Sequence, residues 1–310
     1  MEQEARTSYD VAVVGAGPAG LTAALYAARA GLSVVVLEAL MPGGQMGETG
    51  RIDNYPGFPE GVSGFDLTMQ MQEQCTRFGV DFVNEGLVAS DLAAAPKRLE
   101  TASRTFEARA VIVATGTHSR KLGVPGEAEF AGRGVSYCAT CDGNFFRGKT
   151  VVVVGGGNTA AADAIYLARI CETVHLVHRR DRLRATAAEQ HRIAAIDNVV
   201  FHLNKTVRTI EGDGGAVSGL VIEDVQTGAT EDIPASAVFV AVGKVPNTDV
   251  FAGQLPLDEA GYVVADESGV TSVPGVFVAG DVRAKRLRQV ATAVGDGANA
   301  AEVAAEWLAS

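Results

Sequence analysis

The chain shows the same order of apolar runs and helical patterns twice. In each copy a short apolar run ends in a glycine-rich turn, an alanine-rich helical pattern follows, and a second apolar run comes next. The runs cover residues 10–15 and Val34–Leu37 in the first copy, and Thr150–Gly155 and Val174–Val177 in the second. Short apolar runs bounded by glycine are typical of buried strands. Each copy therefore predicts a strand–helix–strand unit.

The internal spacing of the two copies agrees. From Gly15 to Glu38 is 23 positions, and from Gly155 to His178 is again 23 positions, so the copies lie 140 residues apart. The helical patterns end near residue 30 in the first copy and near residue 171 in the second. A strand, a glycine turn of the GxGxxG type and a helix form the dinucleotide-binding unit, so the repeat predicts two such units in one chain.

The first glycine turn favours a dinucleotide with free ribose hydroxyls. Its glycines let the backbone approach a pyrophosphate at the helix N-terminus, where unpaired N–H groups favour an anion. Glu38 ends the second strand, where a carboxylate can accept hydrogen bonds from a ribose. The alternative is a glycine-rich turn without a ligand. The predicted binding residues of this turn are Gly15, Gly17, Pro18, Ala19 and Gly20.

The second copy has a different end to its second strand. In place of an acid it has His178, Arg179 and Arg180, with Arg184 one helical turn later. Guanidinium groups suit a ribose 2′-phosphate by charge and by bidentate geometry, so this unit should prefer NADP(H). The alternatives are a solvated arginine cluster and a packing role for His178. The predicted residues of the turn itself are Gly155, Gly157, Asn158, Thr159 and Ala160.

Between the two copies lies the segment Cys138-Ala-Thr-Cys-Asp-Gly143. Two cysteines at this spacing can form a small disulfide ring and reopen it when they receive two electrons. The same spacing also serves zinc, but zinc needs further ligands, and the sequence offers no second cysteine pair or nearby histidine pair. We therefore predict a redox dithiol of Cys138 and Cys141 and no metal. Asp142 can handle the proton during thiolate formation, or it can be a turn residue before Gly143.

The remaining segments suggest supporting roles. Residues 51–64 are rich in glycine and proline and form a connection long enough to line a ligand. An amphipathic helix is expected over Phe65–Phe78, with Cys75 as a packing residue, and Cys171 is also expected in the core. The apolar run from Val276 ends at Asp281, which can hold a polyol chain by hydrogen bonding. A final helix is expected over Ala291–Leu308.

Composition narrows the class of protein. The 310 residues suggest about two domains of ~150 residues each. With 26 basic and 37 acidic side chains the net charge is −11, and no basic block is present, so nucleic acid is not expected as a partner. No apolar run has the ~18–20 residues of a membrane helix, and the acidic start is unlike a signal peptide. We therefore expect a cytoplasmic protein that does not contact a membrane.

These motifs together resemble the low-molecular-weight, bacterial-type thioredoxin reductases. The resemblance covers nearly the whole chain: GAGPAG at Gly15, GGQ at Gly43, NYPGF at Asn54, CATCDG at Cys138, GGGNTA at Gly155, HRRDRLRA at His178, AGDV at Ala279 and RQV at Arg288. It implies an α/β fold of two Rossmann-like FAD/NAD(P)-binding three-layer domains, the second inserted into the first. It also implies an NADPH-dependent enzyme that is a homodimer and has thioredoxin as its partner.

The resemblance also assigns cofactors and roles. It implies FAD in residues 1–117 and 245–310, and NADPH in residues 118–244, which carry the dithiol. Cys141 would take electrons from the flavin, Cys138 would attack the thioredoxin disulfide, and Asp142 would handle the proton. Besides the first glycine turn and Glu38, the flavin-binding residues that it implies are Gly43, Gly44, Gln45, Asn54, Gly280, Asp281, Arg288, Gln289 and Val290.

The chain departs from the family pattern at two places. The usual GGGDSA is GGGNTA here, which keeps hydrogen-bonding groups but loses one charge. The loop 281–289 lacks the aromatic residue often found before the RQ pair. Two other interpretations remain open. In the first, the chain is a related flavoprotein that uses another electron donor, such as ferredoxin, or a small-molecule dithiol or disulfide substrate. In the second, it is a flavin-binding protein without turnover.

Overall fold

A computed structural model describes residues 6–310, which divide into two compact units. Unit 1 contains the chain up to His118 and again from Val245 to Ser310, and unit 2 is Ser119–Lys244. The domain boundaries expected from the sequence lie after residue 117 and after residue 244. That the first unit holds FAD and the second holds NADPH stays a prediction.

Unit 1 is built on a sheet whose strands follow the order β3-β2-β1-β6-β5-β4, with β17 paired to β6. The strands around β1 are parallel, whereas β4, β5 and β6 pair antiparallel. The bounds are β1 (Ser8–Val14), β2 (Val34–Leu37), β3 (Asp81–Val83), β4 (Leu87–Asp91), β5 (Lys97–Thr101), β6 (Thr105–Val113) and β17 (Val276–Val278).

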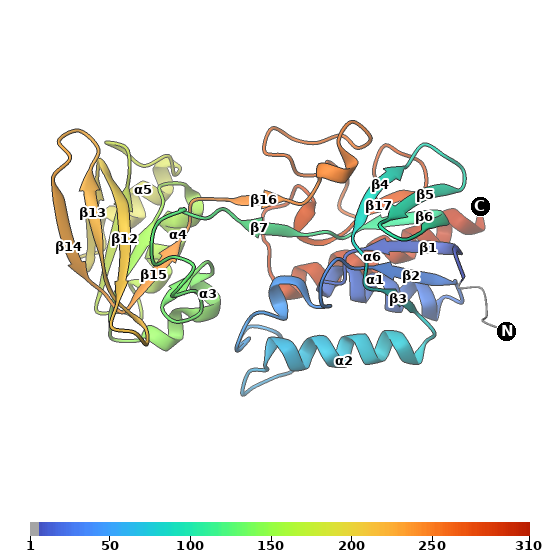
Figure 1. The fold of residues 1–310 in the computed structure, drawn as a ribbon, viewed down its shortest axis with the longest axis horizontal. Coiled ribbons are helices and arrows are strands. Elements are labelled where there is room, and N and C mark those ends of the chain that lie inside the picture. The colour runs from blue at the N-terminus through green and yellow to red at the C-terminus, as the bar shows by residue number, and fades with distance from the viewer. Residues whose placement is uncertain (1–5) are drawn as a thin grey trace. The chain divides into compact units, whose positions relative to one another are not determined.

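The helices α1 (Pro18–Arg29) and α6 (Val290–Ala309) pack against this sheet, and α2 (Gly64–Arg77) packs against α1 (Figure 1). Small residues let α1 and α6 approach closely: a Cβ on Gly297 would lie only 2.2 Å from the carbonyl oxygen of Ala19. Cys75 of α2 is fully buried in this core, as expected. The opposite face of the sheet forms a second core around Phe106 and Phe251.

Unit 2 repeats the plan with a parallel sheet in the order β11-β10-β9-β15-β8. One face is covered by helices and the other by the antiparallel sheet β12-β13-β14, which gives the expected three layers (Figure 1). The strands are β8 (Val135–Ser136), β9 (Thr150–Val154), β10 (Thr173–His178), β11 (Val199–Leu203), β12 (Lys205–Gly212), β13 (Val217–Asp224), β14 (Thr230–Pro234) and β15 (Ala237–Val240); the helices are α3 (Ala139–Asp142), α4 (Asn158–Leu167) and α5 (Ala187–Ala194).

Two short strands lie where the chain passes between the units. β7 (Thr117–Ser119) pairs with β16 (Lys244–Pro246). Short 3-10 turns complete the structure: η1 (Gly44–Met46), η2 (Gly143–Phe146), η3 (Asp249–Phe251) and η4 (Gly280–Val282). Within residues 6–310 no helix is both long enough and apolar enough to cross a membrane.

Two sequence expectations about unit 2 were wrong in detail. α4 ends at Leu167 rather than near Cys171, because the chain turns there: the N–H groups of Arg169 and Ile170 donate to carbonyls three residues back instead of four. Arg184 is not one helical turn beyond Arg180, because residues 179–186 are irregular and α5 begins only after the N-cap Thr186.

Candidate functional site

The two cysteines of the central motif form a disulfide. Cys138 and Cys141 are joined at the two ends of the first turn of α3, with their Cα atoms 5.3 Å apart. Both are partly exposed, whereas Cys75 and Cys171 are buried and unpaired with each other. The disulfide is therefore accessible to a reactant, and the buried thiols are part of the cores.

Asp142 is held beside this disulfide by a residue that the sequence did not single out. The buried hydroxyl of Ser136 donates to Oδ2 of Asp142 at 2.6 Å, and it accepts the backbone N–H of Cys138 at 3.1 Å. The N–H of Asp142 in turn donates to the carbonyl of Cys138 at 3.1 Å. One serine thus connects the first cysteine with the acid. No motif marks such a serine, since serine is common in turns.

The dithiol segment rests on α4. A Cβ on Gly143 would lie 2.9 Å from the side chain of Leu167 and 3.0 Å from that of Tyr166, so glycine lets the segment approach α4 closely. Phe146 packs its ring edge-on against Phe239 of β15, with centroids 5.9 Å apart. The sheet and α4 therefore hold the disulfide segment in a fixed position within unit 2.

The first glycine turn has one crowded side and one open side. The N–H of Gly15 donates to Leu37 at 2.8 Å, and a Cβ on Gly15 would lie 2.4 Å from the carbonyl oxygen of Ala114. Gly20 is equally crowded, since its Cβ would meet the carbonyl oxygen of Gly15. At Gly17, the N-cap of α1, a Cβ would meet nothing within 4 Å, which leaves room for a ligand.

Glu38 closes one side of this turn. Its Oε2 accepts the N–H of Ala16 at 2.7 Å and its Oε1 accepts the N–H of Leu40 at 3.1 Å. Each carboxylate oxygen has a second lone pair, so these bonds orient Glu38 and leave acceptor capacity for ribose hydroxyls. Gly44 lies next to Gly17: its Cβ would be 3.7 Å from the Cα of Gly17. The residues present fit a dinucleotide.

Other predicted residues of unit 1 come together in pairs. The amide of Asn54 donates to Oε1 of Gln289 at 2.9 Å, although the two residues are 235 positions apart. Gln45 donates to the carbonyl of Thr117 at 2.6 Å, and Val290 packs in a small core with Leu67. Asn54 is thus hydrogen-bonded to the residue that caps the start of α6, since Gln289 is the N-cap of that helix.

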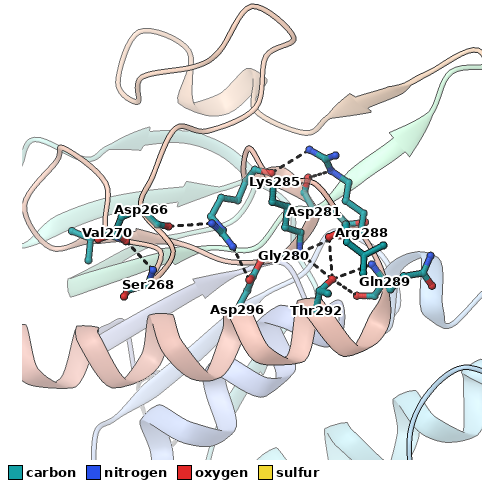
Figure 2. A network of polar contacts seen from close by, with 12 residues as sticks. Asp266, Ser268, Val270, Gly280, Asp281, Lys285, Arg288, Gln289, Thr292 and Asp296 are labelled. Atoms are coloured by element: carbon teal, nitrogen blue, oxygen red, sulfur yellow. Dashed lines mark hydrogen bonds and ion pairs between the residues drawn. The ribbon is translucent and has the colours of Figure 1, made fainter. Parts of the chain in front are cut away.

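Gly280 and Asp281 lie in a polar network that Figure 2 shows. Gly280, with φ +80°, lies against the first turn of α1, since its Cβ would be 2.7 Å from that of Ala19. Arg288 donates through Nε to the carbonyl of Asp281 at 3.2 Å, and its guanidinium lies 4.0 Å over the ring of Tyr262. Arg288 therefore fixes the loop between η4 and α6.

The second glycine turn has the same geometry as the first. The N–H of Gly155 donates to Val177 at 3.0 Å, and a Cβ on Gly155 would lie 2.3 Å from the carbonyl oxygen of Ala241. A Cβ on Gly157 would meet nothing within 4 Å, as at Gly17. Thr159 is exposed and Ala160 is buried in the first turn of α4. This turn fits a second dinucleotide.

The predicted arginines lie on a loop that is fastened to this turn. Gly156 accepts the N–H of Arg184 at 2.6 Å, and Oδ1 of Asn158 accepts the N–H of Thr186 at 2.8 Å. The side chains of Arg179, Arg180 and Arg184 are exposed. Asn158, which departs from the family pattern, thus connects the glycine turn to the arginine loop.

His178 is buried under Gly156, where a Cβ would overlap the imidazole ring. Burial, followed by the charges of Arg184 and Arg180, lowers the pKa of His178 below its usual value of 6.5. Its Nε2 has no hydrogen-bond partner among the described residues. The neutral form of His178 is therefore favoured, and its ring packs against Gly156.

A histidine pair in unit 2 was missed by the sequence analysis. Nδ1 of His175 lies 2.9 Å from Nε2 of His202, and Nδ1 of His202 lies 3.9 Å from Glu231. The two histidines meet only because β10 and β11 pair in parallel. Among the residues that the structure describes, no group of three or more His, Cys, Asp or Glu side chains could hold a metal ion.

Comparison with known proteins gives a consistent result. Residues 9–297 match the family model described as pyridine nucleotide-disulphide oxidoreductase. The chain is 44% identical over 300 residues to the thioredoxin reductase of Listeria monocytogenes (97% of this chain, 94% of that protein) and 43% identical over 294 residues to that of Bacillus subtilis (95% and 93%). The crystal structure of thioredoxin reductase from Streptococcus pyogenes matches with a TM-score of 0.90 at 44% identity, covering 98% of this chain and 99% of that one.

Proposed function

The chain belongs to the pyridine nucleotide-disulphide oxidoreductases and, among them, to the thioredoxin reductases, and from this we propose that it reduces the disulfide of thioredoxin with electrons from NADPH. The observation that carries the proposal is the partly exposed Cys138–Cys141 disulfide, with Asp142 held beside it. A flavoprotein of this family without that disulfide could not exchange thiols with a protein substrate.

The proposed exchange uses the two cysteines in turn. After reduction, the Cys138 thiolate attacks one sulfur of the thioredoxin disulfide, forms a mixed disulfide and releases the other sulfur as a thiolate. Cys141 then attacks Cys138, which restores the Cys138–Cys141 bond and releases thioredoxin as a dithiol. Asp142 would supply and accept the protons that these thiolates need.

The two glycine turns would hold the two nucleotides. FAD, when bound, supplies two-electron transfer between a nicotinamide and a disulfide. The Gly15–Gly20 turn and Glu38 would bind its pyrophosphate and ribose, with the Asn54–Gln289 pair and Asp281 toward the rest of the flavin. The turn at Gly155 would bind the NADPH pyrophosphate, and Arg179, Arg180 and Arg184 its 2′-phosphate.

Turnover of the purified chain with FAD tests the proposal. Thioredoxin reduction should occur with NADPH, be much slower with NADH, and disappear in Cys138→Ser while flavin stays bound. Cys75→Ser is the matched control and should keep the activity, because Cys75 lies in the core of unit 1. Full activity in Cys138→Ser would contradict the assignment of Cys138 and Cys141 as the redox-active pair. Bound flavin without reduction by NADPH would move the electron donor to another molecule such as ferredoxin.

We also propose that the protein is a homodimer in the cytoplasm. The resemblance to the thioredoxin reductases supports both statements. Sedimentation of the purified chain would give twice the monomer mass of 32.1 kDa if the dimer forms. A monomer mass at micromolar concentration would contradict it.

A further inference from the structure

Asp296 of α6 is a buried carboxylate that accepts hydrogen bonds from several residues of the loop predicted to bind flavin. Its side chain is 11% exposed. Oδ2 accepts the backbone N–H of Gly280 at 3.0 Å and lies 2.8 Å from Nζ of Lys285. Oδ1 accepts Nη2 of Arg283 at 2.8 Å. Because α6 is the longest helix bounding this region, Asp296 ties the loop to a rigid element (Figure 2).

Lys285 lies between two carboxylates. Its ammonium is 2.8 Å from Asp296 and 3.7 Å from Oδ1 of Asp281, and its side chain is only 8% exposed. A lysine is rarely buried to this extent unless its charge is compensated. Asp296 anchors the ammonium, and the ammonium attracts the carboxylate of Asp281. The position of Asp281 therefore depends on a residue 15 positions later through Lys285.

The two carboxylates lie among cations. Asp281 and Asp296 each carry a negative charge, Lys285 and Arg283 form ion pairs with them, and Arg288 donates to the backbone carbonyl of Asp281. Among these ion pairs only that of Lys285 reaches the Asp281 carboxylate, so loss of Lys285 would remove that cation in a region of low exposure, where charges are weakly screened. The same region would receive a ligand with two phosphate groups. Loss of a cation there would therefore oppose binding as well as weaken the hold on Asp281.

We propose that Lys285, anchored by Asp296, is a positioning residue for flavin binding, which holds the Asp281 carboxylate where it accepts hydrogen bonds from hydroxyls of the flavin's polyol chain. The inference rests on the proposed function, since it takes FAD as the ligand of unit 1. It adds a residue that no sequence motif indicated, and it concerns Lys285 rather than a residue in contact with the flavin.

Affinity for FAD tests this inference apart from activity. The full-length chain is freed of flavin and titrated with FAD, and binding is followed by quenching of the flavin fluorescence. Lys285→Met should weaken binding about 10- to 100-fold, as expected when the Asp281 carboxylate is no longer held in place to accept a charge-assisted hydrogen bond from the flavin. Lys285→Arg should stay within about threefold of the original chain. Arg286→Met is the matched control, because Arg286 is exposed, carries the same charge and is the next residue.

A double-mutant cycle separates positioning from a general loss of structure. If Lys285 acts through Asp281, Lys285→Met should cost much less in an Asp281→Asn background than in the original chain. An equal loss in both backgrounds overturns the inference, as does unchanged affinity in Lys285→Met. Circular dichroism of the flavin-free proteins checks folding, and Lys285→Gln replaces the methionine variant if that one does not fold. If the original chain binds no FAD at all, the proposed function fails and this inference fails with it.

Discussion

The hydroxyl of Ser136 connects Asp142 with the backbone of Cys138: it donates to the carboxylate at 2.6 Å and accepts the N–H of the cysteine at 3.1 Å. Because Ser136 is buried at the end of β8, these two bonds fix both groups relative to the sheet of unit 2. The acid is thereby oriented before any substrate arrives. Preorganised groups of this kind lower a barrier without reorganisation during the reaction.

We therefore expect Ser136→Ala to slow thioredoxin reduction. Loss of the hydrogen bond that orients the Asp142 carboxylate, worth about 1 kcal/mol net, predicts a decrease in kcat of roughly fivefold. Flavin content and the KM for NADPH should not change, since both predicted nucleotide sites are elsewhere. Steady-state kinetics with thioredoxin provide the measurement, and Ser218→Ala on the exposed face of β13 is the control. Unchanged kcat in Ser136→Ala would show that Asp142 needs no such support.

Substitutions of Gly155 and Gly157 in the second turn should have different effects, one on folding and the other on nucleotide binding. Gly155→Ala puts a Cβ 2.3 Å from the carbonyl of Ala241 and should lower the free energy of unfolding by a few kcal/mol, about 1–3. Gly157→Ala meets nothing within 4 Å and should fold normally, but its methyl group would occupy the open side where the pyrophosphate is proposed. Thermal unfolding and the KM for NADPH are measured on both. A Gly157→Ala variant with normal KM would contradict the proposed nucleotide position.

Removal of one guanidinium should alter the preference between the two nicotinamide nucleotides. Arg179→Ala should raise the KM for NADPH by roughly 10- to 100-fold, the range for a hydrogen bond to a charged group, and leave the KM for NADH nearly unchanged. Arg208→Ala is a suitable control, since Arg208 is an exposed arginine of β12 that pairs with Glu223. Equal effects on both nucleotides would mean that the arginine does not contact a 2′-phosphate.

The histidine pair predicts a pH dependence of stability. Burial is the main cause that lowers the pKa values of His175 and His202 below 6.5. The negative charge of Glu231 opposes this shift in both histidines, and the positive charge of Lys205 adds to the shift of His202. Because the unfolded chain binds more protons than the folded chain in this pH range, the free energy of unfolding depends on pH. The stabilisation that the pair contributes is fully present above about pH 6.5 and is lost as the pH falls through the lowered pKa values. The slope is at most about 1.4 kcal/mol per pH unit for each proton.

Thermal unfolding between about pH 7 and pH 5 checks this dependence. His202→Gln removes one titrating ring and should give a flatter curve than the original chain. His191→Gln, at an exposed position of α5, should leave the curve as it was. A His202→Gln curve as steep as the original would assign the loss of stability to other groups.

Local patterns explain which parts of the structure could be predicted. The strand–turn–helix units at Gly15 and Gly155 follow from residues within about thirty positions of each other, and the structure confirms both. The Cys138–Cys141 bond is equally local. The sequence did not reveal contacts that depend on strand register or on distant segments. His175 meets His202 only through the β10–β11 pairing, and Asn54 meets Gln289 across 235 positions.

The boundary of α4 shows a different limit. Apolar periodicity continued to Cys171, but the last residues serve as a turn whose carbonyls receive Gly148 and Asn198. Such a competition between helix propensity and tertiary hydrogen bonds is not visible in one sequence. The same applies to Arg184, whose loop is fixed by Gly156.

The paired strands β7 and β16 have a consequence for how such a chain could arise. The N–H of Asn247 donates to Gly116 at 3.0 Å on the unit 1 side, and the N–H of Arg120 donates to Gly243 at 3.0 Å on the unit 2 side. The chain therefore leaves and re-enters unit 1 at neighbouring points. When the two ends of an inserted segment lie close together, the host domain loses little conformational entropy in holding them. A duplicated gene segment could therefore be inserted at one surface position of unit 1 while the host and the inserted unit both kept their ability to fold.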